Sequence, residues 1–490
     1  MVAFQATFSS RLCVTKAKPV IDLLKLYPKY VIMFKVMKMK TLGAPNERSY
    51  AINKKTRLDK EAAFRLSGFV ISFEEDGVCL MKNILTGEVI SLSREEYQAA
   101  IHLKDTSEGY EYLEQHSLTE PAMHRFIVEA GYNEAEQYLT TVKLIRIMQP
   151  ESPGLKTYTI LPTTGCNARC TYCYEEGYPV MTMTRSTADR LIDYICETRQ
   201  EDSITLSWFG GEPLVCADTI SYICRRLTEK DVPFTSRMIT NASLVTRELT
   251  REMKEVWKLQ RVQVSLDGDR RDYTERKRYL LPEKHNYDRV MEAIGILSEA
   301  DIQVVLRVNF DSDSFTRLRP FLVEMKERFG SLNNVKLYLS ALYQEKAKPG
   351  FTGLTRQMFE LGRYVDALGL NSVYREQKAA AFRLNSCMAD SIDKSVVIDP
   401  EGRFYNCEHL PEGNTWGNIF DGITDRKRYE ELLSPAPLDD KCRSCAFLPQ
   451  CTTFYKNGCP GWFEGCRDYQ YLKTEYELRK LADIERAPQT

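Results

Sequence analysis

The run TTGCNARCTYCYEEG, residues 163–177, holds three cysteines, Cys166, Cys170 and Cys173, separated by three and then two residues. It directly follows the apolar stretch TYTILP, which is typical of a buried strand. Three thiolates can ligate three irons of a four-iron cube and leave the fourth iron open to a substrate or cofactor. A structural zinc site would need a fourth Cys or His nearby, and no histidine lies within about forty residues of the three cysteines. The spacing therefore predicts an open iron–sulfur cluster.

Strand-like apolar runs recur along the chain after these cysteines, with helical patterns such as 186–199 and 287–300 between them. The six runs are TYTILPTT, SITLSWFGG, SRMITN, RVQVSLDG, IQVVLRVNF and VKLYLSAL. Alternation of strand and helix predicts a parallel sheet with right-handed crossovers. We therefore expect an α/β fold, a partial TIM-like (β/α)6 barrel over residues 151–345, with functional residues just past the carboxyl ends of its strands.

These cysteines and strand ends resemble the radical S-adenosylmethionine superfamily. The family signature has the same cysteine spacing and an aromatic residue before the last cysteine, a position that Tyr172 fills. The second strand ends in the family's glycine-glycine-glutamate-proline motif, which receives the amino group of S-adenosylmethionine. Its residues here are Gly210, Gly211, Glu212 and Pro213. The resemblance implies a [4Fe–4S] cluster on the three cysteines that binds S-adenosylmethionine.

Three further strands carry side chains where the family places cofactor contacts. These residues are Thr240, Asn241, Ser265, Asp267, Arg307 and Asn309. Hydroxyl and carboxylate groups suit the ribose hydroxyls, and a guanidinium suits the methionine carboxylate. Two alternatives remain open: Ser265 and Asp267 could simply form a turn at the end of a strand, and Arg307 could pair with Asp267.

A second group of cysteines lies near the C-terminus, and its order resembles the SPASM extension of the superfamily, which binds two auxiliary [4Fe–4S] clusters. The resemblance assigns Cys442, Cys445, Cys451 and Cys466 to one cluster and Cys387, Cys407 and Cys459 to the other. Exchange of Cys459 and Cys466 is left open. A zinc ribbon is the alternative, although it gives Cys387 and Cys407 no role.

Glu408 directly follows Cys407, in the position where sulfatase maturases place an aspartate base. We therefore take Glu408 as the candidate catalytic base. A solvent-exposed carboxylate without a role in the reaction is the alternative interpretation.

The remaining sequence divides into an N-terminal extension, 1–40, a small α+β domain, 41–150, a connecting helical segment, 346–386, the auxiliary cluster domain, 387–470, and a C-terminal helix or tail, 471–490. Within the α+β domain, turn residues predict an antiparallel sheet over about 68–92. Ser93 and Glu96 form a capping-box pattern that opens a helix, and a second helical pattern runs from Pro121 to Glu129.

Bulk composition excludes several classes of partner. The chain has 490 residues with 67 basic and 68 acidic side chains, a balance that points to neither nucleic acid nor an anionic membrane surface. No apolar run approaches the ~18 to 20 residues of a membrane span, and the N-terminus lacks a secretory signal. We expect a cytoplasmic protein, in which the ten clustered cysteines of the 15 serve metal binding rather than disulfides. The other five, Cys13, Cys79, Cys196, Cys216 and Cys224, fit no ligand spacing and are expected to be small buried hydrophobic residues.

The resemblance implies radical chemistry driven by an external one-electron reductant of the flavodoxin or ferredoxin type. SPASM enzymes usually act on peptide or protein side chains. We therefore expect an oxidoreductase-type maturase of a ribosomally made precursor peptide that forms a thioether or related cross-link, with residues 41–150 as a candidate peptide-recognition module. An anaerobic sulfatase-maturating enzyme, which forms formylglycine, is one alternative, and an iron–sulfur electron-transfer or scaffold protein is another.

Overall fold

One large sheet organises the chain. Its strands are β7 (Thr157–Ile160), β8 (Ile204–Trp208), β9 (Phe234–Thr240), β10 (Leu259–Leu266), β11 (Gln303–Phe310), β12 (Val335–Ala341), β14 (Ser395–Ile398) and β15 (Phe404–Tyr405). The computed structural model describes residues 49–50, 56–148, 154–199, 203–342, 344–345, 351–370, 382–383, 394–408, 415–433, 440–450 and 466–486. No helix in these ranges is long and apolar enough to span a membrane.

The six predicted strands, β7 to β12, lie side by side in chain order and pair in parallel. The predicted mixed α/β fold with a central parallel sheet is therefore confirmed. The sheet continues past the predicted barrel, because β14 pairs in parallel with β7 and β15 pairs with β14 in antiparallel orientation. Both strands lie outside residues 151–345, the range predicted for the barrel.

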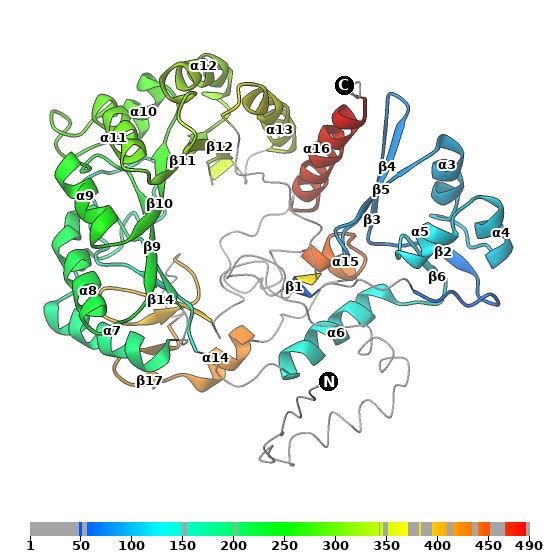
Figure 1. Ribbon diagram of the computed structural model, residues 1–490, viewed down its shortest axis with the longest axis horizontal. Helices are drawn as coiled ribbons and strands as arrows, with labels where there is room; N and C mark the ends of the chain where they lie inside the picture. Colours follow the sequence, from blue (N-terminus) through cyan, green and yellow to red (C-terminus); the bar gives the residue numbers. More distant parts are fainter. Residues whose placement is uncertain are drawn as a thin grey trace, which may run out of the picture.

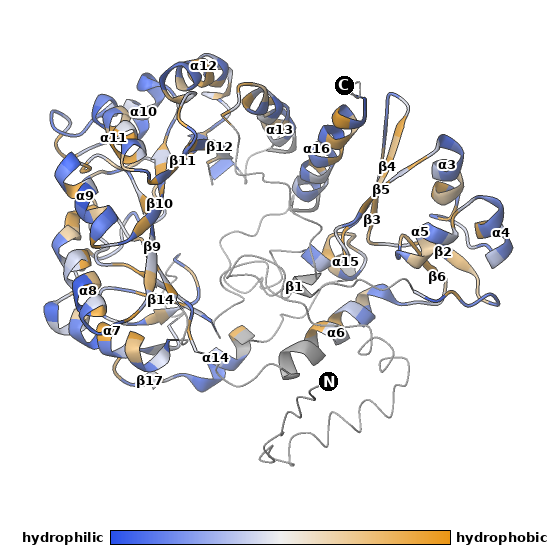
Figure 2. Ribbon diagram, viewed as in Figure 1, coloured by the Kyte–Doolittle hydropathy of each residue, from blue (hydrophilic) through white to orange (hydrophobic). Residues whose placement is uncertain are grey.

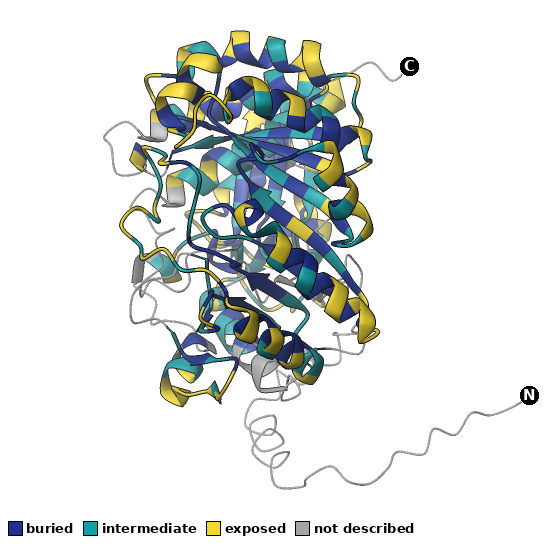
Figure 3. Ribbon diagram, turned by 90° about the vertical axis from the view of Figure 1, so that its left-hand side faces the viewer, coloured by how far each residue is buried: buried dark blue, intermediate teal, exposed yellow. Residues whose placement is uncertain are grey.

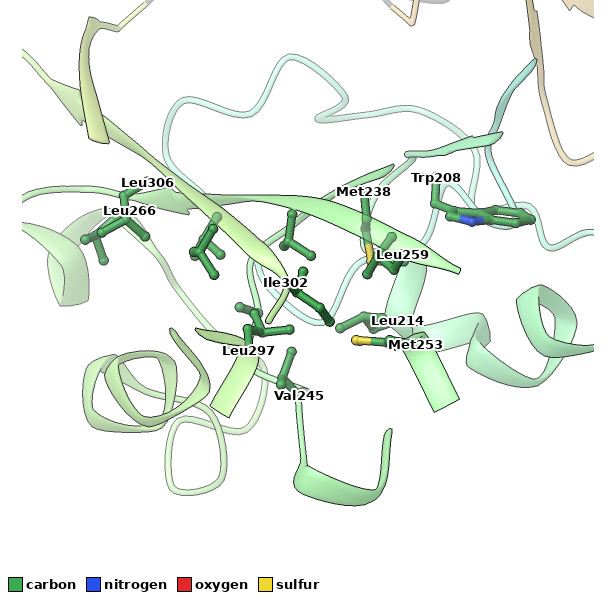
Figure 4. Packing of buried hydrophobic residues seen from close by; sticks show 14 of the residues in the cluster. Trp208, Leu214, Met238, Val245, Met253, Leu259, Leu266, Leu297, Ile302 and Leu306 are labelled. Carbon is green, nitrogen blue, oxygen red and sulfur yellow. The ribbon is translucent and has the colours of Figure 1, made fainter. Parts of the chain in front are cut away.

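Helices cover the outer face of this sheet (Figure 1). They are α7 (Arg185–Thr198), α8 (Ala217–Glu229), α9 (Arg247–Glu255), α10 (Arg270–Arg276), α11 (Tyr287–Glu299) and α12 (Leu318–Phe329). Their apolar sides meet the strands in a core that includes Trp208, Met238, Leu259 and Leu306 (Figure 4). The opposite sides of the helices are exposed (Figure 3). The outer face thus packs against the helices, and the inner face carries polar side chains together with a smaller apolar cluster of Leu161, Val397 and Tyr405.

The N-terminal part forms a separate small unit beside the sheet (Figure 1). Its elements are β2 (Phe64–Leu66), β3 (Val70–Glu75), β4 (Val78–Asn83), β5 (Val89–Leu92), α3 (Arg94–His102), α4 (Tyr110–Gln115), α5 (Thr119–Met123), β6 (Ile127–Glu129) and α6 (Glu134–Met148). Strands β3, β4 and β5 form the predicted antiparallel sheet, and Ser93 and Glu96 form the predicted capping box.

The predicted helix from Pro121 to Glu129 is wrong in its second half. Helix α5 ends at Met123, and Arg125 has a φ of +64°, a left-handed conformation that does not continue a helix. The following segment, β6, pairs with β2 in antiparallel orientation. Pairing with a distant strand therefore outweighed the local helical pattern.

The C-terminal helix α16 (Cys466–Arg486) connects the two parts, and it begins a few residues before the predicted 471. Its Tyr476 Oη donates a hydrogen bond to Asp366 Oδ2 on α13 (Phe351–Ala367) at 2.7 Å. On its other side, Arg479 pairs with Glu75 of β3 at 2.9 Å, and Leu478 lies in an apolar cluster with Phe73, Leu80 and Phe447. Figure 2 shows apolar residues where α16 approaches β3 and β4.

Shorter elements complete the described chain. These are β1 (Ser49–Tyr50), β13 (Phe382–Arg383), β16 (Gly417–Asn418), β17 (Gly422–Ile423), α14 (Arg426–Leu433) and α15 (Asp440–Arg443). The strands β1 and β13 are far apart in the sequence and pair in antiparallel orientation, Ser49 with Arg383 and Tyr50 with Phe382.

Replacing Leu478 with alanine should loosen the small unit from α16. Leu478 is fully buried, and removing a buried leucine side chain costs about 2–5 kcal/mol. We expect faster amide hydrogen exchange in β3 and β4 than in the unmodified protein, measured by mass spectrometry. The control is Ile484→Ala on the same helix, because Ile484 is 59% exposed. Unchanged exchange in the Leu478→Ala variant would show that this contact does not hold the unit.

Candidate cofactor site

The loop that carries the three cysteines touches the end of β8 backbone to backbone. A Cβ atom at Gly210 would stand 2.2 Å from the carbonyl oxygen of Thr163, and one at Gly211 would stand 2.4 Å from that of Gly165. Gly211 N donates to the Thr163 carbonyl at 3.2 Å, and Glu212 N donates to the Gly165 carbonyl at 3.0 Å. Side chains at residues 210 and 211 would displace the loop, so both glycines are needed to position the cysteines.

Glu212 joins the ends of β8 and β9. Its carboxylate is almost fully buried and accepts hydrogen bonds from Thr240 Oγ1 at 2.7 Å, Asn241 N at 2.8 Å and Leu214 N at 3.1 Å. Burial raises the pKa of Glu212, and the hydrogen bonds oppose that shift. Pro213 begins the short 3-10 helix that follows. The carboxylate of Glu212 thus fixes two other predicted cofactor contacts, Thr240 and Asn241.

A pair of amide side chains ties the cysteine loop to the end of β9. Asn241 Nδ2 donates to Asn167 Oδ1 at 2.8 Å, and Asn167 Nδ2 donates to Ser243 Oγ at 3.0 Å. Asn167 lies between the first two cysteines. Neither Asn167 nor Ser243 was among the predicted site residues, although both are neighbours in sequence of residues that were.

Asp267 forms the centre of a second buried network. Its carboxylate accepts hydrogen bonds from Tyr172 Oη at 2.7 and 2.8 Å and from Asn309 Nδ2 at 2.9 Å. Lys277 Nζ lies 3.4 Å from Asp267 Oδ2 and 3.2 Å from Tyr172 Oη. Asp267 is fully buried and Lys277 is 5% exposed. The predicted residues Tyr172, Asp267 and Asn309 therefore meet, and the carboxylate is occupied by partners from this chain.

Lys277 is the principal site residue that the sequence did not reveal. It lies in the charged run ERKR, residues 275–278, which gives no sign of which side chain is buried. This segment runs beside the cysteine loop, where Thr171 N donates to the Arg276 carbonyl at 3.1 Å and Arg169 N donates to the Arg278 carbonyl at 2.7 Å. Burial acts to lower the pKa of Lys277, but the charge of Asp267, together with those of Tyr172, Cys170 and Tyr273, outweighs it and the net pKa is raised well above its usual value.

The three thiols are free and half-buried on this loop. Burial raises the pKa of Cys166 to about 12, with a further contribution from the charge of Glu212, and burial raises that of Cys170 to about 11. The pKa of Cys173 is also raised by burial. In the described ranges no three Cys, His, Asp or Glu side chains converge on a single metal ion. The charge of the Lys277 ammonium acts on all three thiols. Three thiols spaced along one loop suit a cluster of several iron atoms, whose positive charge would offset that of the buried thiolates.

Arg307 lies apart from the Asp267 network. Its Nε and Nη2 atoms lie 3.3 and 3.2 Å from Ser340 Oγ, so the alternative pairing of Arg307 with Asp267 is not formed. Ser265 is the neighbour of Arg307 in the register between β10 and β11. Both side chains are half-buried, and their predicted contacts to the cofactor stay predictions.

Glu408, the candidate base, follows β15. Its Oε2 accepts a hydrogen bond from Cys407 Sγ at 3.6 Å. The charge of Glu408 raises the pKa of Tyr174, a residue of the cysteine loop, in addition to the larger effect of burial there. Glu408 is therefore close enough to the loop for its charge to act there, and its catalytic role stays a prediction.

The predicted auxiliary ligands are described only in part. Cys442 and Cys445 share one turn, in which Cys445 N donates to the Cys442 carbonyl at 3.1 Å. Cys387, Cys451 and Cys459 lie outside the described residues, and Cys466 is described only as the first residue of α16. The two auxiliary clusters stay predictions.

Comparison with known proteins identifies the central part of the chain. Residues 160–311 match the radical SAM superfamily. The cysteine-type anaerobic sulfatase-maturating enzyme of Clostridium perfringens is 20% identical over 336 residues, which cover 62% of this chain and 88% of that protein. An uncharacterized protein of Methanothermobacter thermautotrophicus is 28% identical over 167 residues, covering 32% of this chain and 58% of the relative's length.

Solved structures share the fold. Native anSMEcpe with bound AdoMet and Kp18Cys peptide has a TM-score of 0.52 and 15% identity, with 67% of this chain and 99% of that chain covered. Native anSMEcpe with bound AdoMet has a TM-score of 0.51 and 15% identity, with 67% of this chain and 99% of that chain covered. At this identity the likeness establishes a common architecture.

Replacing Lys277 with methionine should destabilise the protein, because it leaves the buried Asp267 without a counter-charge. Breaking a buried ion pair from one side costs about 3–5 kcal/mol. Urea denaturation should show this loss in the free energy of unfolding. Lys277→Arg keeps the charge and should lose less. If the methionine variant were as stable as the unmodified protein, the ion pair would not support the site.

Proposed function

We propose that this chain, which belongs to the radical SAM superfamily through residues 160–311, modifies a ribosomally made precursor peptide and forms a thioether or related cross-link in it. The observation that carries the proposal is the positioning of three free thiols by the paired glycines, Glu212 and Asp267 at one end of a parallel sheet. Superfamily membership implies a [4Fe–4S] cluster and S-adenosylmethionine as cofactors.

When bound, these two cofactors would supply the radical that removes a hydrogen atom from the substrate. The cysteines would hold the cluster, and Asn241, fixed by Glu212 and Asn167, would contribute polar contacts beside it. Positioning the reacting groups is the protein's main contribution to such chemistry. Glu408 would accept a proton near the loop.

A peptide substrate is supported by two features. The fold is shared with a protein whose solved structure contains a bound peptide, and the small N-terminal unit presents the edge strand β5, whose strand partner among the described residues is β4. Peptides commonly bind by adding a strand to such an edge. We propose that a leader segment of the precursor pairs with β5.

A second candidate function is oxidation of a sulfatase cysteine or serine to formylglycine. It is favoured by the 20% identity to a sulfatase-maturating enzyme. The two functions give different products from different peptides, so mass spectrometry of a treated precursor and of a treated sulfatase peptide separates them.

The first test removes the thiols. A triple variant, Cys166→Ala, Cys170→Ala and Cys173→Ala, should contain about four fewer irons per chain than the unmodified protein and should form no 5′-deoxyadenosine with dithionite and S-adenosylmethionine. Cys196→Ala, on α7, is the control and should retain both. Absence of 5′-deoxyadenosine from the fully reconstituted unmodified protein would instead favour an electron-transfer or scaffold role.

The second test concerns the leader. The neighbourhood of this gene is first searched for a short cysteine-rich reading frame. Adding the peptide that such a frame encodes should slow amide hydrogen exchange in β5, because new strand pairing protects its outward amides. The central strand β4 serves as the internal control, since its amides are already paired. Binding without any protection at β5 would reject this mode of recognition.

A further inference from the structure

The inner face of the sheet carries several cations. Along β10, Val262, Val264 and Leu266 are buried in the core against the helices, so the alternate residues Arg261, Gln263 and Ser265 lie on the other face. The same alternation places one basic residue of each neighbouring strand on this inner face. These residues are Arg237 on β9, Arg307 on β11 and Lys336 on β12.

Arg237 and Arg261 are direct neighbours in the register between β9 and β10. Like charges opposite each other on neighbouring strands are destabilising. Burial and the charge of Arg261 both lower the pKa of Arg237, and the charge of Glu408 only partly opposes them. Arg237 is exposed and Arg261 is half-buried, so water reaches both guanidinium groups.

Neither guanidinium has a hydrogen-bond or ion-pair partner within the described ranges, and two other arginines show the contrast. Arg276 pairs with Asp311 at 2.7 Å, and Arg225, on the outer helix α8, pairs with Glu252 at 2.8 Å. Nearby on the inner face, Tyr338 Oη donates to Gln263 Oε1 at 3.1 Å, so these neutral groups satisfy each other. Two adjacent, accessible and unmatched guanidinium groups provide a site for an anion.

We propose that Arg237 and Arg261 bind a carboxylate of the peptide substrate, a role that rests on the proposed function and names an acidic peptide segment as its ligand. Arg261 lies four residues before Ser265, so at about 3.3 Å per residue the pair is roughly 13 Å from the strand end that faces the cysteine loop. The methionine carboxylate of S-adenosylmethionine would bind at that strand end. The arginine pair therefore holds a separate group deeper in the barrel.

The test uses the full chain with reconstituted clusters and bound S-adenosylmethionine. Equilibrium dialysis measures the binding of three radiolabelled probes: Ac-Gly-Gly-Glu-Gly-Gly-NH2, its glutamine counterpart, and acetyl-pentaglycine with a free terminal carboxylate. A carboxylate bound by guanidinium groups should bind at least about tenfold more tightly than the glutamine peptide. Preference for the glutamyl probe assigns the site to an acidic side chain, and preference for the pentaglycine probe assigns it to a chain terminus.

The double variant Arg237→Gln, Arg261→Gln should lose this preference and keep its affinity for S-adenosylmethionine within about twofold. Arg225→Gln, which removes the same charge from the outer surface, should keep both. The proposal is overturned if the unmodified enzyme shows no preference for a carboxylate, if the double variant retains it, or if that variant loses S-adenosylmethionine binding instead. Formation of 5′-deoxyadenosine by the unmodified enzyme is scored separately, so failure of the radical function is distinguishable from failure of this site.

Discussion

The buried carboxylate of Asp267 is the interaction on which the rest of the site depends. A fully buried charge is tolerated only when it is paired and hydrogen-bonded, and here its partners come from three places in the chain: Tyr172 in the cysteine loop, Lys277 after α10 and Asn309 on β11. The hydrogen bonds to this one carboxylate therefore fix the cysteine loop to β10 and β11. Tyr172 stands directly before Cys173, so this bond also orients the last of the three thiols.

The other side of the cysteine loop packs against Gly210 and Gly211, which have no side chains to push it away. The carbonyl groups of Thr163 and Gly165 occupy the space in which Cβ atoms of residues 210 and 211 would stand, and Glu212 secures the next turn to β9. Glycines in such a motif can let a ligand approach the backbone closely. In the structure they admit the cysteine loop itself, so the motif positions the cofactor through the loop that would bind it.

Much of this arrangement could be predicted, because strand order in a parallel sheet follows chain order and strand ends carry the site. Apolar runs located β7 to β12, and the predicted residues Tyr172, Asp267 and Asn309 lie together in the structure. The burial of Lys277 could not be predicted, because it depends on an ion pair with Asp267, ten residues earlier. Nothing in the charged run shows which of its side chains forms that pair. Strand β14 was missed because only four residues pair with β7, too few for a periodic pattern, and β6 because its partner β2 is distant in sequence.

The two faces of the sheet differ in how their charged side chains are paired. Several cations of the outer helices pair with nearby carboxylates, such as Arg225 with Glu252. On the inner face, Arg237 and Arg261 stand in register, and no residue that the structure describes pairs with either of them. Stability alone would favour a neutral residue at one of the two positions, since placing the cations side by side costs free energy. The presence of both arginines is explained if a ligand supplies the compensating anion. The unpaired charge would then serve binding rather than folding.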